Sequence, residues 1–371
     1  MLILPSAPKL LLPVPKWQWR EPSAAQQKDQ FGRQNRTRFV IRLWKLDGAL
    51  VDERWYDDRD EFDHDLFRFI IEEPCADIFV EYAVTTTLTS PTGSNQTYSV
   101  PADWNNAINT VECIGGGASG GAVRVNTGIS VASGGGGGGY GIYANLSLSP
   151  GGSATYQIGA TAAGVTVSTV TNAPGNAGNS TWFDGTTYAG ASVGGAGGTN
   201  GTGGAANQNG GAGGTGKGTG SFSGGRGGNY TGGGSSRIAT GGGGAAGRSG
   251  NGGNGTDLAT SGTNTATAGG TGDNGTGGAG SSGPASGTSS SAGGDGTEMD
   301  GIGAGGGSGG AHGSSSTVTS GAGGNYGAGT GGGAKSSTGN VGSGTAAQGA
   351  IWITYTPVLG TDVGRFLLMF N

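Results

Sequence analysis

Carboxylates are the residues of this sequence that most invite a catalytic interpretation, because glycoside hydrolysis needs two acids at a fixed separation in a groove. Among the acids in residues 115–349, only Asp295, Glu298 and Asp300 lie near one another in the sequence. No neighbouring residues suggest side chains that would hold them in a catalytic geometry. The sequence also has no G-x-S-x-G or H-E-x-x-H motif and no Cys/His zinc spacing. We therefore expect no enzymatic activity, and interpret the three neighbouring acids as turn residues. The acids of this stretch are Asp184, Asp257, Asp273, Asp295, Glu298 and Asp300.

An acidic run at residues 57–65, which includes His64, could in principle hold calcium, because hard cations prefer several carboxylates close together. It lacks the glycine at the sixth position and the closing glutamate of an EF-hand loop. We expect a solvated loop, no metal site and no cofactor. Cys75 and Cys113 lie on either side of a break in composition, so two buried thiols are expected rather than a disulfide.

A nucleic-acid partner is also not expected. Residues 224–228, Gly-Gly-Arg-Gly-Gly, resemble one RGG element of RNA-binding proteins, but a single element is weak evidence. Residues 115–349 contain six basic and six acidic residues, so they produce no net field that attracts phosphates. The formal charge of the whole chain is −5.

Bulky side chains among the glycines are better candidates for recognition. The glycine-rich segments are expected to pack closely side by side, and large side chains would force them apart. We therefore expect the large side chains on surfaces or at loop tips. Aromatic residues beside arginine and asparagine suit a sugar or an outer-membrane protein, through stacking and hydrogen bonds. The alternative is that each such residue merely covers the outside. The receptor-binding candidates, expected in a loop over residues 217–238 at one end, are Phe222, Arg226, Tyr230 and Arg237.

The glycine-rich stretch, residues 115–349, must position these candidates, and it contains 84 of the 89 glycines. Ordering so much glycine costs conformational entropy that few large side chains could offset, so backbone hydrogen bonds must compensate. Extended threefold rods without side chains can pack closely enough to bond laterally. Collagen is excluded, because the glycine spacing is irregular and only three prolines occur in the stretch. The sequence predicts a polyglycine II helix bundle.

The N-terminal quarter has a different composition, since residues 1–84 hold 27 of the 43 charged residues. Alternation over residues 39–44, the turn Asp47-Gly48 and a returning strand over 50–56 predict a hairpin, and 66–71 and 78–84 predict two more strands. The fold class is therefore mainly β: a small N-terminal β domain, then a β-rich base that carries the bundle. The expected parts are an extended arm 1–36, a β anchor domain 37–84, a linker 85–96, a display domain 97–357 and an apolar tail 358–371.

The apolar start of the chain suggests neither an export signal nor a membrane span. Prolines interrupt it, no positive region precedes it, and it is too short to cross a bilayer. We expect no membrane insertion.

Five ordered segments flank and enter the glycine tracts: Tyr-Ser-Val-Pro-Ala-Asp-Trp-Asn at 98–105, Asn-Thr-Val-Glu-Cys-Ile-Gly-Gly-Gly at 109–117, strand-like runs at 140–151 and 154–159, and Gly-Ala-Ile-Trp-Ile-Thr-Tyr-Thr-Pro at 349–357. Over residues 97–357 the sequence resembles the glycine-rich domain of tailed-bacteriophage tail fibres and adhesins. The resemblance implies a bundle whose connecting loops are exposed at the far end and bind the host surface.

The expected function is that of a structural virion protein, a tail fibre or tail-tip adhesin on the particle surface. Its expected partners are other virion proteins through the N-terminal region and a bacterial surface polysaccharide or outer-membrane protein. A homo-oligomer, with a trimer as one option, is also expected. The alternatives are a head fibre or decoration protein, and a cellular surface adhesin, which the lack of an export signal disfavours.

Overall fold

The architecture is mainly β, as the alternating patterns of the sequence predict. The structure, a computed structural model, describes residues 36–45, 50–56, 78–126, 128–204, 206–232, 237–259, 264–273, 275–277, 290–297, 304–313, 317–335 and 339–358. These residues contain no helix and belong to one compact unit that begins at Asn35. The arm before Arg36, the acidic run, the expected strand 66–71, Cys75 and residues 359–371 lie outside the described residues.

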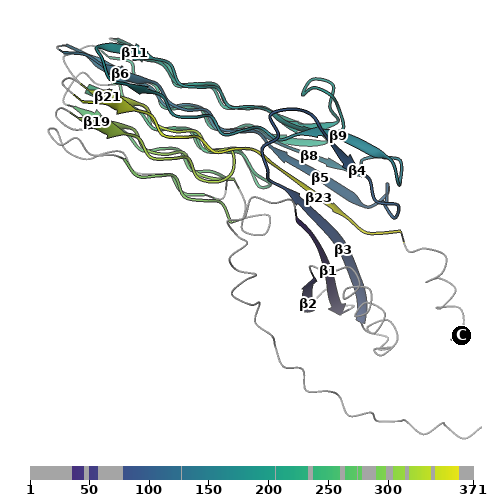
Figure 1. Cartoon of the computed structure of the whole chain (residues 1–371). Helices are drawn as coiled ribbons and strands as arrows, with labels where there is room; N and C mark the ends of the chain where they lie inside the picture. Colours follow the sequence, from purple (N-terminus) through teal and green to yellow (C-terminus); the bar gives the residue numbers. More distant parts are fainter. Residues whose placement is uncertain are drawn as a thin grey trace, which may run out of the picture. The chain divides into compact units, whose positions relative to one another are not determined.

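A seven-stranded sheet brings the N-terminal strands beside the strand that closes the glycine-rich region (Figure 1). All its neighbouring strands are antiparallel. The expected strands at 50–56 and 78–84 are confirmed. In spatial order the sheet contains β16 (Gly220–Phe222), β8 (Tyr140–Ala144), β5 (Asn109–Ile114), β23 (Ala350–Tyr355), β3 (Ile78–Leu88), β1 (Arg36–Lys45) and β2 (Leu50–Tyr56).

A five-stranded sheet packs against this first sheet through the largest apolar cluster of the described chain. Val111 and Ile353 from the first sheet and Phe183 and Val193 from the second are all fully buried. Burying one such side chain stabilises a fold by about 1.5–3 kcal/mol. We call the two sheets together the base. The second sheet contains β15 (Gly216–Lys217), β13 (Val193–Gly195), β12 (Thr181–Phe183), β9 (Ser153–Gln157) and β4 (Gln96–Ser99).

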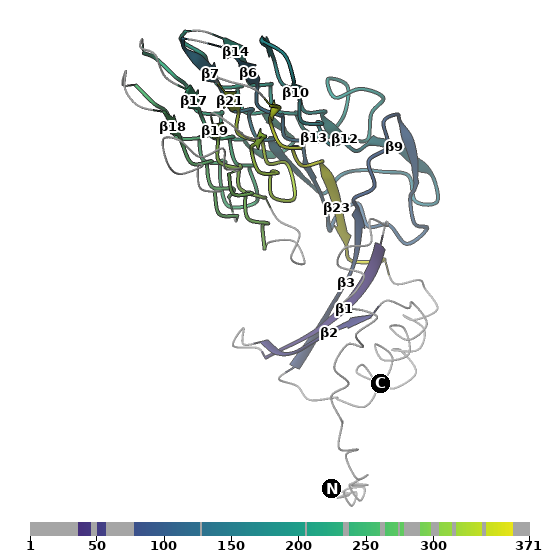
Figure 2. The same ribbon diagram turned by 60° about the vertical axis from the view of Figure 1, so that its left-hand side comes forward.

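Three small sheets form a second β region, which we call the far layer (Figure 2). Several of their neighbouring strands are parallel, including β6 with β21 and β7 with β17. The first sheet contains β10 (Thr166–Val167), β22 (Val341–Gly342) and β20 (Val318–Thr319). The second contains β11 (Thr171–Ala173), β6 (Ala122–Arg124), β21 (Gly333–Lys335) and β19 (Ala311–Gly313). The third contains β14 (Gly203–Gly204), β7 (Ser130–Ala132), β17 (Arg237–Ala239) and β18 (Thr265–Ala266).

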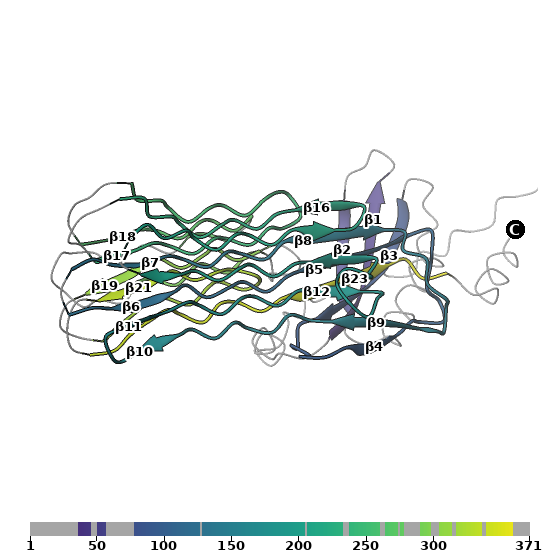
Figure 3. The same cartoon turned by 90° about the horizontal axis from the view of Figure 1, so that it is seen from above.

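Glycine-rich segments run between the base and the far layer, side by side (Figure 3). They are neither helix nor strand, and their backbone N–H groups bond laterally in a period of three. In residues 115–121, the N–H groups of Gly115, Ala118 and Gly121 donate to the carbonyls of residues 139, 136 and 133. Those of Gly116 and Ser119 donate to 179 and 176, and that of Gly117 to 347. Each segment is therefore bonded to several neighbours at once.

The segments lie so close together that a side chain would not fit between them. A Cβ added to Gly117 would lie 2.0 Å from the Ala328 carbonyl oxygen, and one added to Gly243 would lie 2.0 Å from that of Gly225. Such distances are far below van der Waals contact. Glycine is required at these positions because a neighbouring backbone occupies the place of a side chain.

One strand crosses the boundary near Val84 that the composition suggests. β3 continues to Leu88, into the expected linker 85–96, and pairs with β23. β1 pairs with β3 along its whole length, so the N-terminal strands extend the base sheet. The change in composition near Val84 marks a change along one strand and not a gap between two cores.

Candidate functional site

Three of the four receptor-binding candidates, Phe222, Arg226 and Tyr230, lie along one segment that runs from the base to the far layer, and Arg237 begins the next segment, which runs back toward the base. Phe222 is the last residue of β16 in the base, and Arg237 is the first residue of β17 in the far layer. Arg226 and Tyr230 lie between them. The structure therefore does not bring the four together in one terminal loop, and each has surroundings of its own.

Phe222 covers the edge of an apolar cluster in the base. Its ring stacks on Tyr140 with centroids 6.4 Å apart, and the cluster also contains Ile114 and Trp352. The side chain is half-buried. Packing thus occupies one face of a ring that the sequence suggested for recognition.

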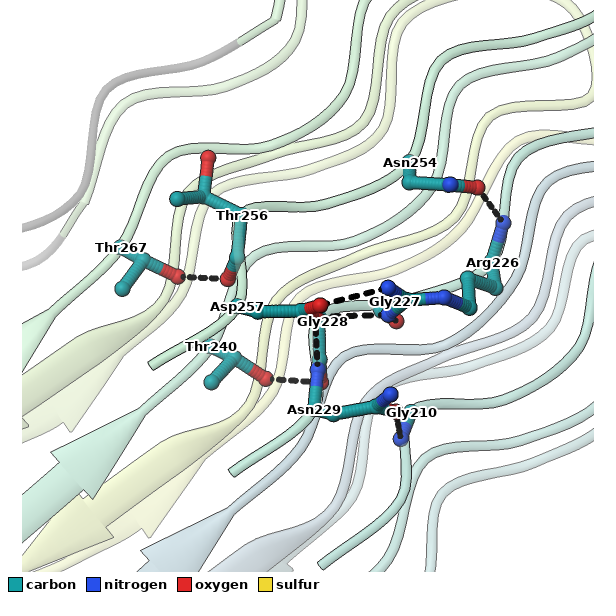
Figure 4. A network of polar contacts seen from close by, with 10 residues as sticks. All are labelled: Gly210, Arg226, Gly227, Gly228, Asn229, Thr240, Asn254, Thr256, Asp257 and Thr267. Atoms are coloured by element: carbon teal, nitrogen blue, oxygen red, sulfur yellow. Dashed lines mark hydrogen bonds and ion pairs between the residues drawn. The ribbon is translucent and has the colours of Figure 1, made fainter. Parts of the chain in front are cut away.

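Arg226 forms a two-pronged ion pair with Asp257 on the neighbouring segment (Figure 4). Both nitrogen–oxygen distances are 2.6 Å. The hydrogen bonds from Arg226 lower the pKa of Asp257, and the same bonds raise the pKa of Arg226. Asp257 Oδ1 also accepts the backbone N–H of Asn229 at 2.7 Å. The carboxylate therefore joins two segments through a side chain and through the backbone.

This contact belongs to a ladder of three polar side chains. Asn251 accepts the N–H of Ser223 and Asn254 accepts that of Arg226, just as Asp257 accepts that of Asn229. The residue after each of the three donates its own N–H back to the carbonyl of the same partner. Side-chain oxygens of Asn and Asp readily replace a backbone acceptor in this way. The spacing N-G-G-N-G-T-D, with a polar residue at every third position, is the sequence signal that could have predicted this ladder.

Buried hydroxyls make a second kind of link. Thr240 Oγ1 accepts the N–H of Gly134 at 3.1 Å and donates to the carbonyl of Gly228 at 2.5 Å. Thr267 Oγ1 likewise accepts the N–H of Gly241 and donates to the carbonyl of Thr256 (Figure 4). Where a hydroxyl widens the gap between two segments, it satisfies both backbone groups. Composition alone would have described these residues as solvent-exposed.

Tyr230 is fully buried, although the sequence suggested that bulky groups stay outside. It packs with Val131 of β7 and Ile238 of β17, where the glycine segments give way to strands that carry side chains. The spacing widens there, and an aromatic ring fits. Its hydroxyl has no hydrogen-bond partner in the described part of the chain. Buried in this way, Tyr230 offers no exposed surface.

Arg237 has the more available guanidinium of the two arginine candidates. Its Nε donates to Asn264 Oδ1 at 2.7 Å, and its side chain is half-buried. Within the described ranges, its two terminal nitrogens make no hydrogen bond and it has no carboxylate partner. An arginine held at Nε still presents a fork that fits a carboxylate, sulfate or phosphate.

The described acids are engaged in bonds within the chain. Asp184 accepts the Ser192 hydroxyl at 2.6 Å, Asp273 accepts the Ser249 N–H at 2.8 Å, and Asp295 accepts the Asn325 N–H at 2.8 Å. Among the described residues, no three His, Cys, Asp or Glu side chains gather as metal ligands would. Glu298 and Asp300 lie outside these ranges.

One charged group is buried in the base. Glu112 of β5 pairs with Arg248 and accepts the Tyr140 hydroxyl at 2.5 Å. Burial, followed by the charge of Glu112, raises the pKa of Tyr140 far above its usual value. Cys113, next along β5, is a buried free thiol whose pKa burial also raises. The Tyr140 hydroxyl and the Cys113 thiol therefore both stay neutral near pH 7, and we assign both side chains a packing role.

Comparison with known proteins gives no family: no protein-family model matches the chain, and no curated protein sequence matches it either. In its described part, the chain contains no helix long and apolar enough to cross a membrane.

Proposed function

We propose that the glycine-rich segments form a bundle of polyglycine II helices. The period-three hydrogen bonding supports this, because a threefold extended helix directs every third N–H to the same side. The second support is the absence of space for Cβ atoms at glycines such as Gly117 and Gly243. A pleated strand has a period of two and would bond to two neighbours only.

The dihedral angles of residues 240–246 test this proposal. A crystal structure at high resolution should give φ near −75° and ψ near +145° through the segment. Values near −120° and +115°, with alternating N–H directions, would mean ordinary strands.

From this architecture we propose the function of a structural virion protein of a tailed bacteriophage, a tail fibre or tail-tip adhesin that contacts the host surface. The observation that carries the proposal is the placement of the β regions. The base contains the N-terminal strands β1 and β2, while the far layer lies at the other end of the glycine segments (Figure 1). In this proposal residues 1–84 attach the protein to the particle and the far layer meets the host.

The test is immunogold labelling. Antibodies raised against the purified chain are applied to particles of the phage that encodes it, and the bound gold is located by electron microscopy. Labelling at the tail tip or fibres is expected. Labelling over the capsid would replace the tail assignment with that of a head fibre, and unlabelled particles would remove the virion role.

A second experiment tests attachment. Deleting residues 1–30 should abolish incorporation while the remaining chain, expressed alone, keeps the melting temperature of the full protein. Normal incorporation of the truncated chain would place the anchor elsewhere.

A further inference from the structure

The strands of the far layer contain three charged residues, all basic, and the three share one edge. Arg124 is the last residue of β6, Lys335 the last of β21 and Arg237 the first of β17. Given the directions in which these strands run, each is the outermost residue of its strand. We call Arg124, Arg237 and Lys335 the basic rim.

Packing holds the rim together. Val123, Ala132, Ala239 and Ala334, one from each of β6, β7, β17 and β21, form a single buried cluster directly beneath it. Arg124 and Lys335 are register partners in adjacent parallel strands. Arg237 is the register partner of Ser130 of β7. The four strand ends therefore lie next to one another.

No acid occurs in the strands of the far layer or in the segments 125–129, 168–170, 205–209, 231–236, 259–264, 314–317 and 336–340 that continue them. Asp257, the acid nearest to Arg237 along the chain, is held by Arg226.

Three further observations point to an anionic ligand. The terminal nitrogens of Arg237 make no hydrogen bond in the described chain, while Asn264 holds its Nε. The buried Ser130 hydroxyl beside it has no partner in that part either. Lys335 is fully buried, and burial followed by the positive charge of Arg124 lowers its pKa. Arg124 and Lys335 are like charges on adjacent strands, so an anion bound at the rim would be attracted by both.

We propose that the basic rim binds an acidic polysaccharide, with Arg124 and Arg237 as direct contacts and Lys335 as a buried charge that raises the local potential. The proposal rests on the proposed role in host recognition and names the chemical class of the partner. The described residues that adjoin the far-layer strands include Asn126, Asn207, Asn264 and Asn340, whose amides match sugar hydroxyls, and they include no exposed Phe, Tyr or Trp on which nucleic-acid bases could stack.

The test measures binding of the full-length chain to polygalacturonate, neutral dextran and single-stranded poly(dT), at 50 mM and 200 mM NaCl. Polygalacturonate should bind at least about tenfold more tightly than dextran, and salt should weaken the binding. Arg237→Gln should reduce affinity about tenfold, as expected for one charge-assisted bond, and Arg237→Lys less.

Arg226→Gln is the matched control, because it also removes one arginine charge, from the preceding segment and away from the rim. It should leave polygalacturonate binding unchanged, and melting curves of all variants check folding. Equal binding of dextran, equal losses in Arg226→Gln and Arg237→Gln, or tighter binding of poly(dT) would each overturn the proposal. The binding test uses purified protein only. Its outcome therefore does not depend on whether gold labelling finds the protein on phage particles.

Discussion

The base and the far layer are both made of β-strands, but they are stabilised differently. The base has two sheets that enclose large aromatic and aliphatic side chains, such as Trp104 and Phe183, and it buries the Glu112 side chain. The far layer has three small sheets; two of its clusters consist of alanine and valine, and the third contains Tyr230 and Ile238. The difference indicates that the base folds on its own apolar core, whereas the far layer depends on the glycine segments beneath it.

The strongest test of this comparison is to disturb the segments that join the two regions. In Gly243→Val the new Cβ would meet the Gly225 carbonyl oxygen at 2.0 Å, so the backbone must move. We expect a loss of stability on the order of 4 kcal/mol in urea unfolding. Gly190→Ala is the control, since its nearest neighbour would be Thr187 Oγ1 at 3.4 Å. Equal stability of the two variants would refute close packing.

A matched pair of core truncations separates the two regions directly. Ile351 in the base and Ile238 in the far layer are both fully buried. Ile351→Ala should cost about 3 kcal/mol and speed amide exchange throughout the described chain, because it damages the main core. Ile238→Ala should speed exchange mainly in the far layer. Global loss of protection in Ile238→Ala would show that the two regions unfold as one.

The hydroxyl links should matter at an intermediate level. Thr240→Val keeps the shape of the side chain but leaves the Gly134 N–H and the Gly228 carbonyl without a partner. The expected cost is about 2 kcal/mol, measured by thermal unfolding. Thr240→Ser retains the hydroxyl and should stay close to the parent protein. A neutral Thr240→Val would mean that the backbone groups find each other directly.

The smallest effect is expected at the exposed ion pair. Because Arg226 lowers the pKa of Asp257, the charged carboxylate stabilises the fold at pH values above the usual aspartate pKa, about 3.9, and this contribution disappears as pH falls through the lowered pKa. Asp257→Asn should therefore cost less than about 1 kcal/mol at pH 7, and nothing at pH 2. A difference that persists at pH 2 would assign the effect to shape and not to charge.

The sequence predicted the strands of the base well, because their side chains alternate. Residues 109–114 and 351–355 carry clear period-two patterns, and the two strands predicted on either side of Asp47-Gly48 pair as β1 and β2. Glycine segments carry no such mark, so neither the neighbours of Gly243 nor the 31-residue separation between Arg226 and Asp257 could be predicted. Tyr230 was expected at a surface because the sequence does not reveal where close packing ends. The ladder of Asn251, Asn254 and Asp257 was readable, since its spacing matches the period of the hydrogen bonds.

The period of three also limits how genes for such a protein can change in length. If the segments are polyglycine II helices, as proposed, losing one residue from a segment such as 240–246 would turn every later N–H by a third of a revolution, toward a different neighbour. Losing three residues would restore all the directions and shorten the segment by about 9 Å. Insertions and deletions between the base and the far layer should therefore survive selection in units of nine nucleotides, while the connecting segments at either end can vary freely.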